Sequence, residues 1–150
     1  MIAAGGAAVR PRAVRACLVV VGGVVVAIDV GTARGVIVFD EMTAVPGAPP
    51  HVRGVANVGG RVVPVIDGRR ALGLGAGLEG RRALLVEHAG TELALTIDDV
   101  LGVEALEPAA EPVPQGWLRG CAEARLQRAG GDAPLLSTPR LIASLRSVAG

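Results

Sequence analysis

The sequence of 150 residues almost lacks aromatic side chains, since it contains one Phe, one Trp and no Tyr. It also lacks Lys, so that all 15 basic residues are Arg, occurring singly or as pairs. Together with 14 acidic residues they leave a formal net charge of +1. Nucleic-acid binding needs clustered positive charge and usually stacking rings. The composition therefore predicts a protein that does not bind nucleic acid.

Cysteine is also scarce. Cys17 and Cys121 are the two cysteines of the chain, and they form no C-x-x-C pair. A disulfide framework or a zinc site depends on several Cys or His residues at short spacing. The chain is therefore expected to lie in a reducing cytoplasm and to hold no metal.

A long apolar run of the kind that spans a membrane is missing as well. Three arginines precede an apolar run over residues 16–28, an order that also occurs in signal peptides. The run is short for a bilayer span, and Asp29 closes it. We expect no direct membrane insertion, although export of a β-rich domain stays open as an alternative.

A β-hairpin explains the same run. Residues 17–21 and 24–28 are two apolar segments joined by Gly22-Gly23, a dipeptide suited to a two-residue turn. Residues 1–14 consist mostly of Ala, Gly, Pro and Arg, a composition typical of a disordered lead-in. We therefore favour a hairpin that follows a disordered segment.

What the chain does contain is aliphatic. Hydrophobic residues make up 51% of it, and Val, which favours strands, is frequent. The 22 Gly and 10 Pro divide the chain into short pieces. These features predict a mainly β fold in one domain, or in two small lobes that share a core.

Further elements are expected along the chain. Asp67 is placed to cap a short helix over residues 69–72 that Gly73 ends. Pro64 indicates an edge or a bulge in its strand, because proline donates no hydrogen bond. The other expected elements are strands over residues 52–56 and 61–66 around a loop at 57–60, strands over 83–87, 92–97, 100–106 and 116–123, and a final helix over 139–148.

No catalytic constellation is visible. His51 and His88 are the two histidines, and neither has a recognisable nucleophile and acid beside it in sequence. Asp98 and Asp99 are neighbours in an expected strand, so their side chains point to opposite faces and do not share a proton or a metal. We therefore expect a protein that is not an enzyme and has no cofactor.

One motif favours an enzyme instead. Residues 28–32, Ile-Asp-Val-Gly-Thr, followed by the apolar run 36–40, resemble the first phosphate loop of the sugar-kinase and actin-like ATPase superfamily. That resemblance implies an ATP-dependent, sugar-kinase-like phosphate-binding fragment in which Asp29 lies near magnesium. The chain has no room for the second phosphate loop of such enzymes, so this function is kept as the alternative.

A second resemblance covers most of the chain. Residues 45–67, VPGAPPHVRGVANVGGRVVPVID, and residues 95–103, LTIDDVLGV, resemble the signatures of CheW-like domains. The similarity extends over roughly residues 16–145. It implies a CheW-like domain over residues 15–150, built from two small SH3-like or OB-like β-barrel lobes packed together, with short helices that include a C-terminal one.

The same resemblance implies a function. CheW-like proteins are cytoplasmic, non-enzymatic adaptors of chemotaxis that couple the cytoplasmic tips of chemoreceptors to the regulatory domain of a CheA-type histidine kinase. A divergent adaptor of another two-component pathway is the second possibility. Such proteins bind through exposed strand edges and apolar patches. The partner-binding residues carried over from the two signatures are Val55, Asn57, Val58, Gly60, Arg61, Val62 and Asp98.

Three positions depart from the family pattern. Gly59 stands where the family usually has Arg, and Gly35 falls where a Glu is common. Loss of both leaves neither charge unpaired, but it removes polar groups that a receptor could bind. Gly68 is the third departure, because the family prefers Leu after the Asp.

Overall fold

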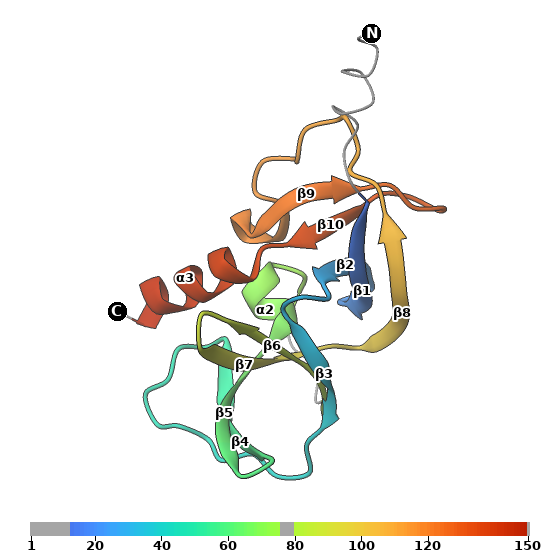
Figure 1. The fold of residues 1–150 in the computed structure, drawn as a ribbon. Coiled ribbons are helices and arrows are strands. Elements are labelled where there is room, and N and C mark those ends of the chain that lie inside the picture. The colour runs from blue at the N-terminus through green and yellow to red at the C-terminus, as the bar shows by residue number, and fades with distance from the viewer. Residues whose placement is uncertain (1–12, 76–79, 150) are drawn as a thin grey trace, which may run out of the picture.

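The computed structural model, which describes residues 13–75 and 80–149, confirms the mainly β prediction (Figure 1). The strands are β1 Val14–Val21, β2 Val24–Asp29, β3 Ala33–Val38, β4 Val52–Val58, β5 Arg61–Ile66, β6 Arg82–His88, β7 Thr91–Thr96, β8 Asp99–Leu106, β9 Ala122–Leu126 and β10 Ala133–Leu136. The helices are α2 Gly68–Leu72, the 3-10 helix η1 Trp117–Gly120, and α3 Thr138–Ala149. None of the helices in the described ranges is long and apolar enough to cross a membrane.

The strands form two five-stranded sheets, which we name lobe 1 (β8-β1-β2-β10-β9) and lobe 2 (β3-β6-β7-β5-β4). Each sheet closes on itself through an extension of one edge strand. In lobe 2, Thr43 follows β3 and bridges to Val55 of β4. In lobe 1, Pro108 follows β8 and bridges to Leu126 of β9. The two β lobes that the family resemblance implies are therefore present.

The chain passes from lobe 1 to lobe 2 and back (Figure 1). It builds β1 and β2 of lobe 1, then all five strands of lobe 2, and returns to lobe 1 with β8. The last helix, α3, follows β10 and packs its buried residues Leu141 and Ile142 into the core that the lobes share. Lobe 2 is thus a continuous insertion between two parts of lobe 1.

The valine-rich run at the start of the domain is buried on both faces. Ala16 and Leu18 of β1 point into lobe 1, whereas Cys17, Val19 and Val21 belong to the core between the lobes. Side chains of a strand alternate between its two faces, so a strand with two buried faces reads as an unbroken apolar run. This double burial explains why the segment resembles an export signal.

The core between the lobes, here called the central core, is the largest of three apolar clusters. Lobe 2 contributes Leu84, Val86, Leu93 and Leu95 to it, opposite the residues of β1. Lobe 2 also has its own interior, lined around Phe39. Each fully buried aliphatic side chain adds about 1.5–3 kcal/mol to the free energy of unfolding, so the central core holds the lobes together.

The glycine turns confirm the hairpin and correct a loop. Gly22 and Gly23 have φ values of +59° and +79°, as a two-residue turn with both residues left-handed requires. The β4–β5 turn is shorter than the expected loop at 57–60, because β4 continues to Val58, which pairs with Arg61. Only Gly59 and Gly60 form that turn.

The region 116–123 was predicted as a strand and is instead η1 followed by the first residues of β9. Leu118 and Arg119 both have φ of +54°, a left-handed conformation that no strand tolerates. The prediction for the short helix is confirmed, since the Asp67 side chain accepts a hydrogen bond from the Arg70 N–H and Gly73 ends α2. The expected lead-in over residues 1–14 falls mostly outside the described residues, and Val14 already belongs to β1.

We expect neither cysteine to react in the folded protein. Cys17 and Cys121 are 8% and 2% exposed, and burial raises the pKa of both thiols above its usual value. Because the thiolate is the nucleophile, both conditions slow modification. In the native state a chromogenic disulfide reagent should therefore release almost no thiolate, and in concentrated guanidinium chloride two equivalents. Rapid labelling of the native protein would contradict this burial.

Candidate partner-binding surface

Six of the seven residues expected to bind partners lie on the β4–β5 hairpin, and Asp98 does not. Gly59 and Gly60 turn the chain there, and the Asn57 side chain accepts a hydrogen bond of 3.0 Å from the Gly60 N–H. Asn57 and Gly60 therefore shape the turn, whatever else they contact. The hairpin forms the end of lobe 2 that lies farthest from α3 (Figure 1).

The two faces of the hairpin differ. Val55, Asn57 and Val62 share the outer face, because Asn57 pairs directly with Val62 and lies two residues from Val55. Val62 is 70% exposed there. Val58 points the other way and packs against the interior of lobe 2. Val62 and Asn57 are thus available to a partner, whereas Val58 supports the fold.

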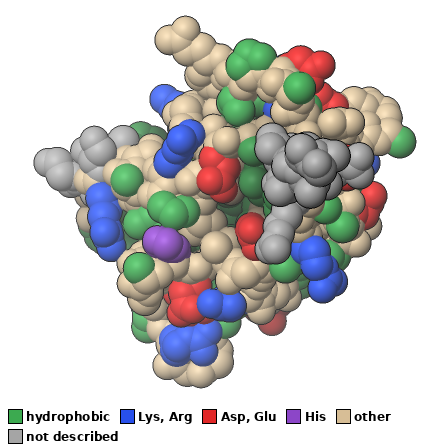
Figure 2. Space-filling model, turned by 45° about the horizontal axis from the view of Figure 1, so that its top comes forward, with side chains coloured by type: hydrophobic (Ala, Val, Ile, Leu, Met, Phe, Trp, Pro, Cys, Tyr) green, Lys and Arg blue, Asp and Glu red, His purple; other side chains and the backbone are tan. Residues whose placement is uncertain are grey.

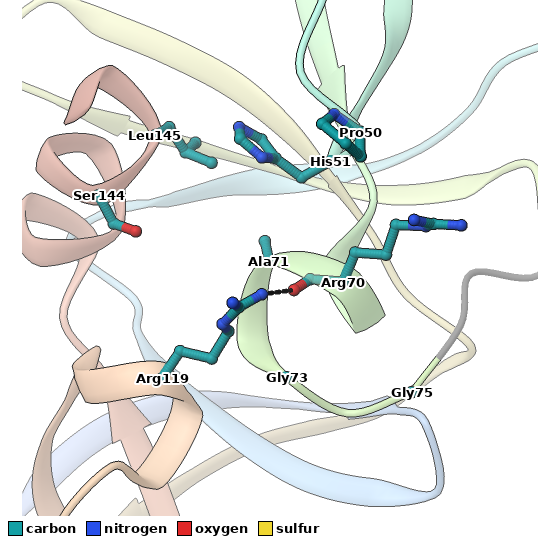
Figure 3. A pocket seen from close by; sticks show the side chains of 9 residues that line it. All are labelled: Pro50, His51, Arg70, Ala71, Gly73, Gly75, Arg119, Ser144 and Leu145. Atoms are coloured by element: carbon teal, nitrogen blue, oxygen red, sulfur yellow. Dashed lines mark hydrogen bonds between the residues drawn. The ribbon is translucent and has the colours of Figure 1, made fainter. Parts of the chain in front are cut away.

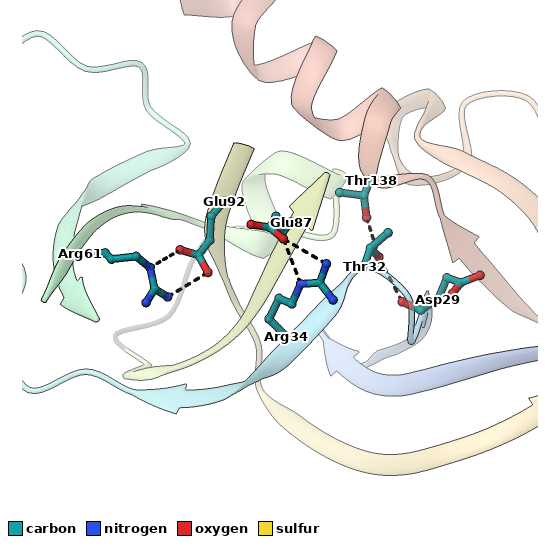
Figure 4. A network of polar contacts seen from close by, with 7 residues as sticks. All are labelled: Asp29, Thr32, Arg34, Arg61, Glu87, Glu92 and Thr138. Atoms are coloured by element: carbon teal, nitrogen blue, oxygen red, sulfur yellow. Dashed lines mark hydrogen bonds and ion pairs between the residues drawn. The ribbon is translucent and has the colours of Figure 1, made fainter. Parts of the chain in front are cut away.

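Arg61 joins the hairpin to β7. Its guanidinium forms two hydrogen bonds with the Glu92 carboxylate, at 3.0 and 3.1 Å (Figure 4). The hydrogen bond to Glu92 is the main reason that the pKa of Arg61 is raised above its usual value. A partner that binds Arg61 has to share it with Glu92 or displace Glu92.

Asp98 lies between β7 and β8 and joins the lobes. It accepts hydrogen bonds from Arg69 at 2.9 and 3.3 Å, and a longer one of 3.4 Å from the Gly23 N–H. Arg69 belongs to α2, within the lobe 2 segment, and Gly23 to the first turn of lobe 1. These contacts give Asp98 a structural role, and the structure does not bring it to the hairpin.

The end of β3 completes the hairpin surface. A hollow of about 540 Å³ is lined by residues of both, including Val38, Asp40, Asn57 and Gly59. Val38 is 68% exposed, so it and Val62 are the two most exposed large apolar side chains of the described residues. We call Val38, Asn57 and Val62 the hairpin surface.

A second exposed apolar surface lies on β8 of lobe 1. Leu101 and Val103 are 49% and 52% exposed, and Leu101 lies at a β-bulge where the pairing of β8 with β1 shifts. Within the described ranges, β8 is paired along its length with β1 alone, so its other edge is open. Sequence reasoning missed this β8 edge as a site, although the alternation of Leu101 and Val103 was a signal.

The glycines that replace charged family residues lie in open space. Gly35 has a φ of +140° at a bulge of β3, and a Cβ there would meet no atom within 4 Å. At Gly59, with φ of +57°, a Cβ would lie 3.5 Å from the Arg61 guanidinium. Both positions have positive φ, a backbone conformation that glycine adopts more readily than other residues.

The motif that resembles a phosphate loop has a structural role here. The Gly31 N–H donates to the Asp29 carboxylate at 2.7 Å, and the Thr32 hydroxyl donates to the Asp29 carbonyl. The Thr138 hydroxyl of α3 donates in turn to Thr32 at 3.2 Å (Figure 4). The residues fix the turn between β2 and β3 against α3.

Charged side chains of both signs are mixed on one face of the molecule (Figure 2). On the face shown in Figure 2, basic and acidic side chains are interspersed with apolar ones and form no patch of a single sign. Over the part of the chain that the structure describes, no group of three or more His, Cys, Asp or Glu is placed to hold a metal ion. The two surfaces with the most exposed large apolar side chains of the described residues are the hairpin surface and the β8 edge.

The fold thus consists of two closed β lobes on a shared core, and each lobe has an exposed apolar surface. The structure is similar to that of the scaffolding protein TtCheW from Thermoanaerobacter tengcongensis, with a TM-score of 0.70 and 19% identity over 84% of this chain and 88% of that one. The model of the CheW-like domain matches residues 15–146. The chain belongs to the CheW-like domain family, whose members are non-enzymatic scaffolds.

Two curated relatives are similar in sequence. Protein PilI of Pseudomonas aeruginosa is 41% identical over 64 residues, which are 41% of this chain and 36% of PilI. The chemotaxis protein CheW of Thermotoga maritima is 32% identical over 78 residues, 51% of this chain and 52% of that protein. The matches thus span about a third and about half of the relatives' own lengths. Neither they nor the family match gives the sugar-kinase alternative any support.

Proposed function

We propose that the protein is a cytoplasmic adaptor that couples chemoreceptors to a CheA-type histidine kinase in chemotaxis signalling. The observation that carries the proposal is the family match over residues 15–146. A chemosensory adaptor binds the receptor tip and the regulatory domain of the kinase. It shifts the kinase towards one of two states because it binds that state more tightly than the other.

The geometry supports simultaneous binding. An adaptor needs two separate surfaces, and the chain has the hairpin surface on lobe 2 and the β8 edge on lobe 1. The open edge of β8 suits binding by strand addition, and the exposed apolar side chains of the hairpin surface suit apolar packing. The two lobes are in direct contact through the central core. Two partners bound to the two surfaces would therefore form one rigid assembly with the adaptor.

The test is calorimetry with the purified chain, the regulatory domain of a CheA-type kinase from the same genome, and the receptor tip. We expect micromolar affinity for the kinase domain. Val62→Asp and Val103→Asp should each lower the affinity for one partner at least about tenfold and leave the affinity for the other unchanged. Each substitution places a charge in one apolar contact. Val45→Asp, at a residue 43% exposed that lies outside both surfaces, is the matched control.

Several outcomes would contradict the proposal. Absence of binding to the kinase domain would contradict the coupling function. A single variant that abolishes the binding of both partners would contradict two separate binding surfaces. A second titration with magnesium and ATP tests the alternative enzyme. Heat in that titration that disappears in Asp29→Ala would favour the sugar-kinase-like function over the adaptor.

A further inference from the structure

A cavity of about 500 Å³ lies where α2, α3, η1 and the segment before β4 meet (Figure 3). It is away from the hairpin surface and the β8 edge, since none of their residues lines it. Ligand-binding cavities of proteins have volumes of about 300–1,000 Å³. Its walls combine apolar and polar side chains: Ala71, Leu145, His51, Arg70, Arg119 and Ser144.

The Arg119 guanidinium is fixed at this cavity. It donates a hydrogen bond of 3.0 Å to the Arg70 carbonyl, and the Arg119 side chain packs closely over Gly73, where a Cβ would lie 2.7 Å from its Cγ. Among the residues that the structure describes, no carboxylate lies within ion-pair distance of Arg119. Arg70 differs, because it pairs with Asp67 at 3.5 Å. Arg119 therefore brings an uncompensated positive charge to the cavity.

His51 adds an unsatisfied polar atom. Its imidazole ring lines the cavity, while its Nε2 is shielded from solvent and has no hydrogen-bond partner among the described residues. Burial first, and the positive charge of Arg119 second, lower the pKa of His51. Figure 3 shows His51, Arg119 and the Ser144 hydroxyl around the same space. A negative group there would favour the protonated form of His51, which burial and Arg119 disfavour.

An apolar groove of about 230 Å³ adjoins the cavity and shares His51 and Leu145 with it. Its other apolar lining comes from β5, β7 and α3, including Ile66, Leu93 and Ile142. A short alkyl group attached to an anion in the cavity would therefore lie beside an apolar surface.

We propose that this cavity binds a small organic anion, a carboxylate or a phosphate that carries a short apolar group. The anionic end lies between Arg119 and His51, with the Ser144 hydroxyl as a further donor. The apolar end lies along Leu145 towards the groove. The site is separate from the two partner surfaces, so it stands independently of the adaptor function.

The two histidines provide the test, because each gives its own imidazole signals in the proton NMR spectrum. His51 reports on the cavity, and His88, exposed at the end of β6, is the internal control. The probes are inorganic phosphate, acetate and hexanoate. We expect a saturable shift of the His51 signals with an unmoved His88, and at least about tenfold tighter binding of hexanoate than of acetate, because methylene groups are buried.

Substitution of Arg119 tests whether its guanidinium binds the anion in addition to its hydrogen bond with the Arg70 carbonyl of α2. Arg119→Gln should weaken hexanoate binding at least about tenfold. Arg81→Gln is the matched control, since Arg81 also donates to a backbone carbonyl, that of Asp40 at 3.3 Å. If Arg119→Gln fails to fold, Arg119→Gly is the second variant, because glycine adopts the φ of +54° without strain.

The proposal is overturned by a shift that does not saturate, by equal shifts of His51 and His88, or by unchanged binding in a folded Arg119 variant. Equal affinity for acetate and hexanoate would overturn the apolar part. Loss of kinase binding in the calorimetry described above would leave these results untouched, so the two proposals fail separately.

Discussion

Gly68→Ala is expected to lower the free energy of unfolding by about 3 kcal/mol, and Gly68→Leu by more, although the family prefers Leu at this position. A Cβ on Gly68 would lie 2.2 Å from the Thr96 carbonyl oxygen and 3.4 Å from Val21. The Gly68 N–H also donates to the Thr96 hydroxyl at 2.9 Å, which holds α2 close against β7. A backbone carbonyl in a paired strand cannot rotate away as a side chain would.

Urea denaturation measures this effect, with Gly80→Ala as the matched control. Among the described residues, a Cβ on Gly80 would meet only the Ile97 carbonyl oxygen, at an ordinary distance of 3.9 Å. The control should therefore change the unfolding free energy by less than about 1 kcal/mol. Equal stabilities of the two variants would show that α2 moves away from β7 at little cost.

Leu95→Ala is expected to cost about 2–5 kcal/mol, the range for a large aliphatic residue truncated in a core. Leu95 is fully buried in β7 and belongs to the central core. The substitution leaves a cavity between the lobes, so both lobes should lose stability together. Leu101→Ala, at a residue 49% exposed on β8, should change stability by no more than about 0.5 kcal/mol.

Two probes distinguish joint from separate unfolding. Trp117, the single tryptophan, lies in η1 before β9 and reports on lobe 1 by fluorescence, whereas far-UV circular dichroism reports on the strands of both lobes. The transitions should coincide in the natural protein and in Leu95→Ala. A fluorescence transition at a different urea concentration would contradict a core shared by the lobes.

Local features of the fold were predictable from the sequence, and distant pairings were not. The Gly22-Gly23 turn and the cap of α2 depend on residues next to one another, so the sequence alone predicts them. The pairing of β1 with β8 joins residues nearly ninety positions apart, such as Ala16 and Glu104. No local signal specifies it, and only the family resemblance implied two lobes.

The candidate site was predictable in part for the same reason. The resemblance located the β4–β5 hairpin, but Val62 at 70% exposure and Val63 at 2% are identical in type, and their environments follow only from the closed sheet. Asp98 was carried over from the second family signature, and in the structure it joins the lobes instead of lying at the hairpin. The bond between Arg61 and Glu92 spans 31 positions, which no short motif records.

The insertion of lobe 2 within lobe 1 sets the order in which the protein is completed during synthesis. At a typical elongation rate of about 5–20 residues per second, β1 waits several seconds or longer for β8. All five strands of lobe 2 are synthesised in that interval. The valine-rich first hairpin is therefore a nascent segment that a chaperone, or a neighbouring ribosome's identical hairpin, meets before its own partner strand exists.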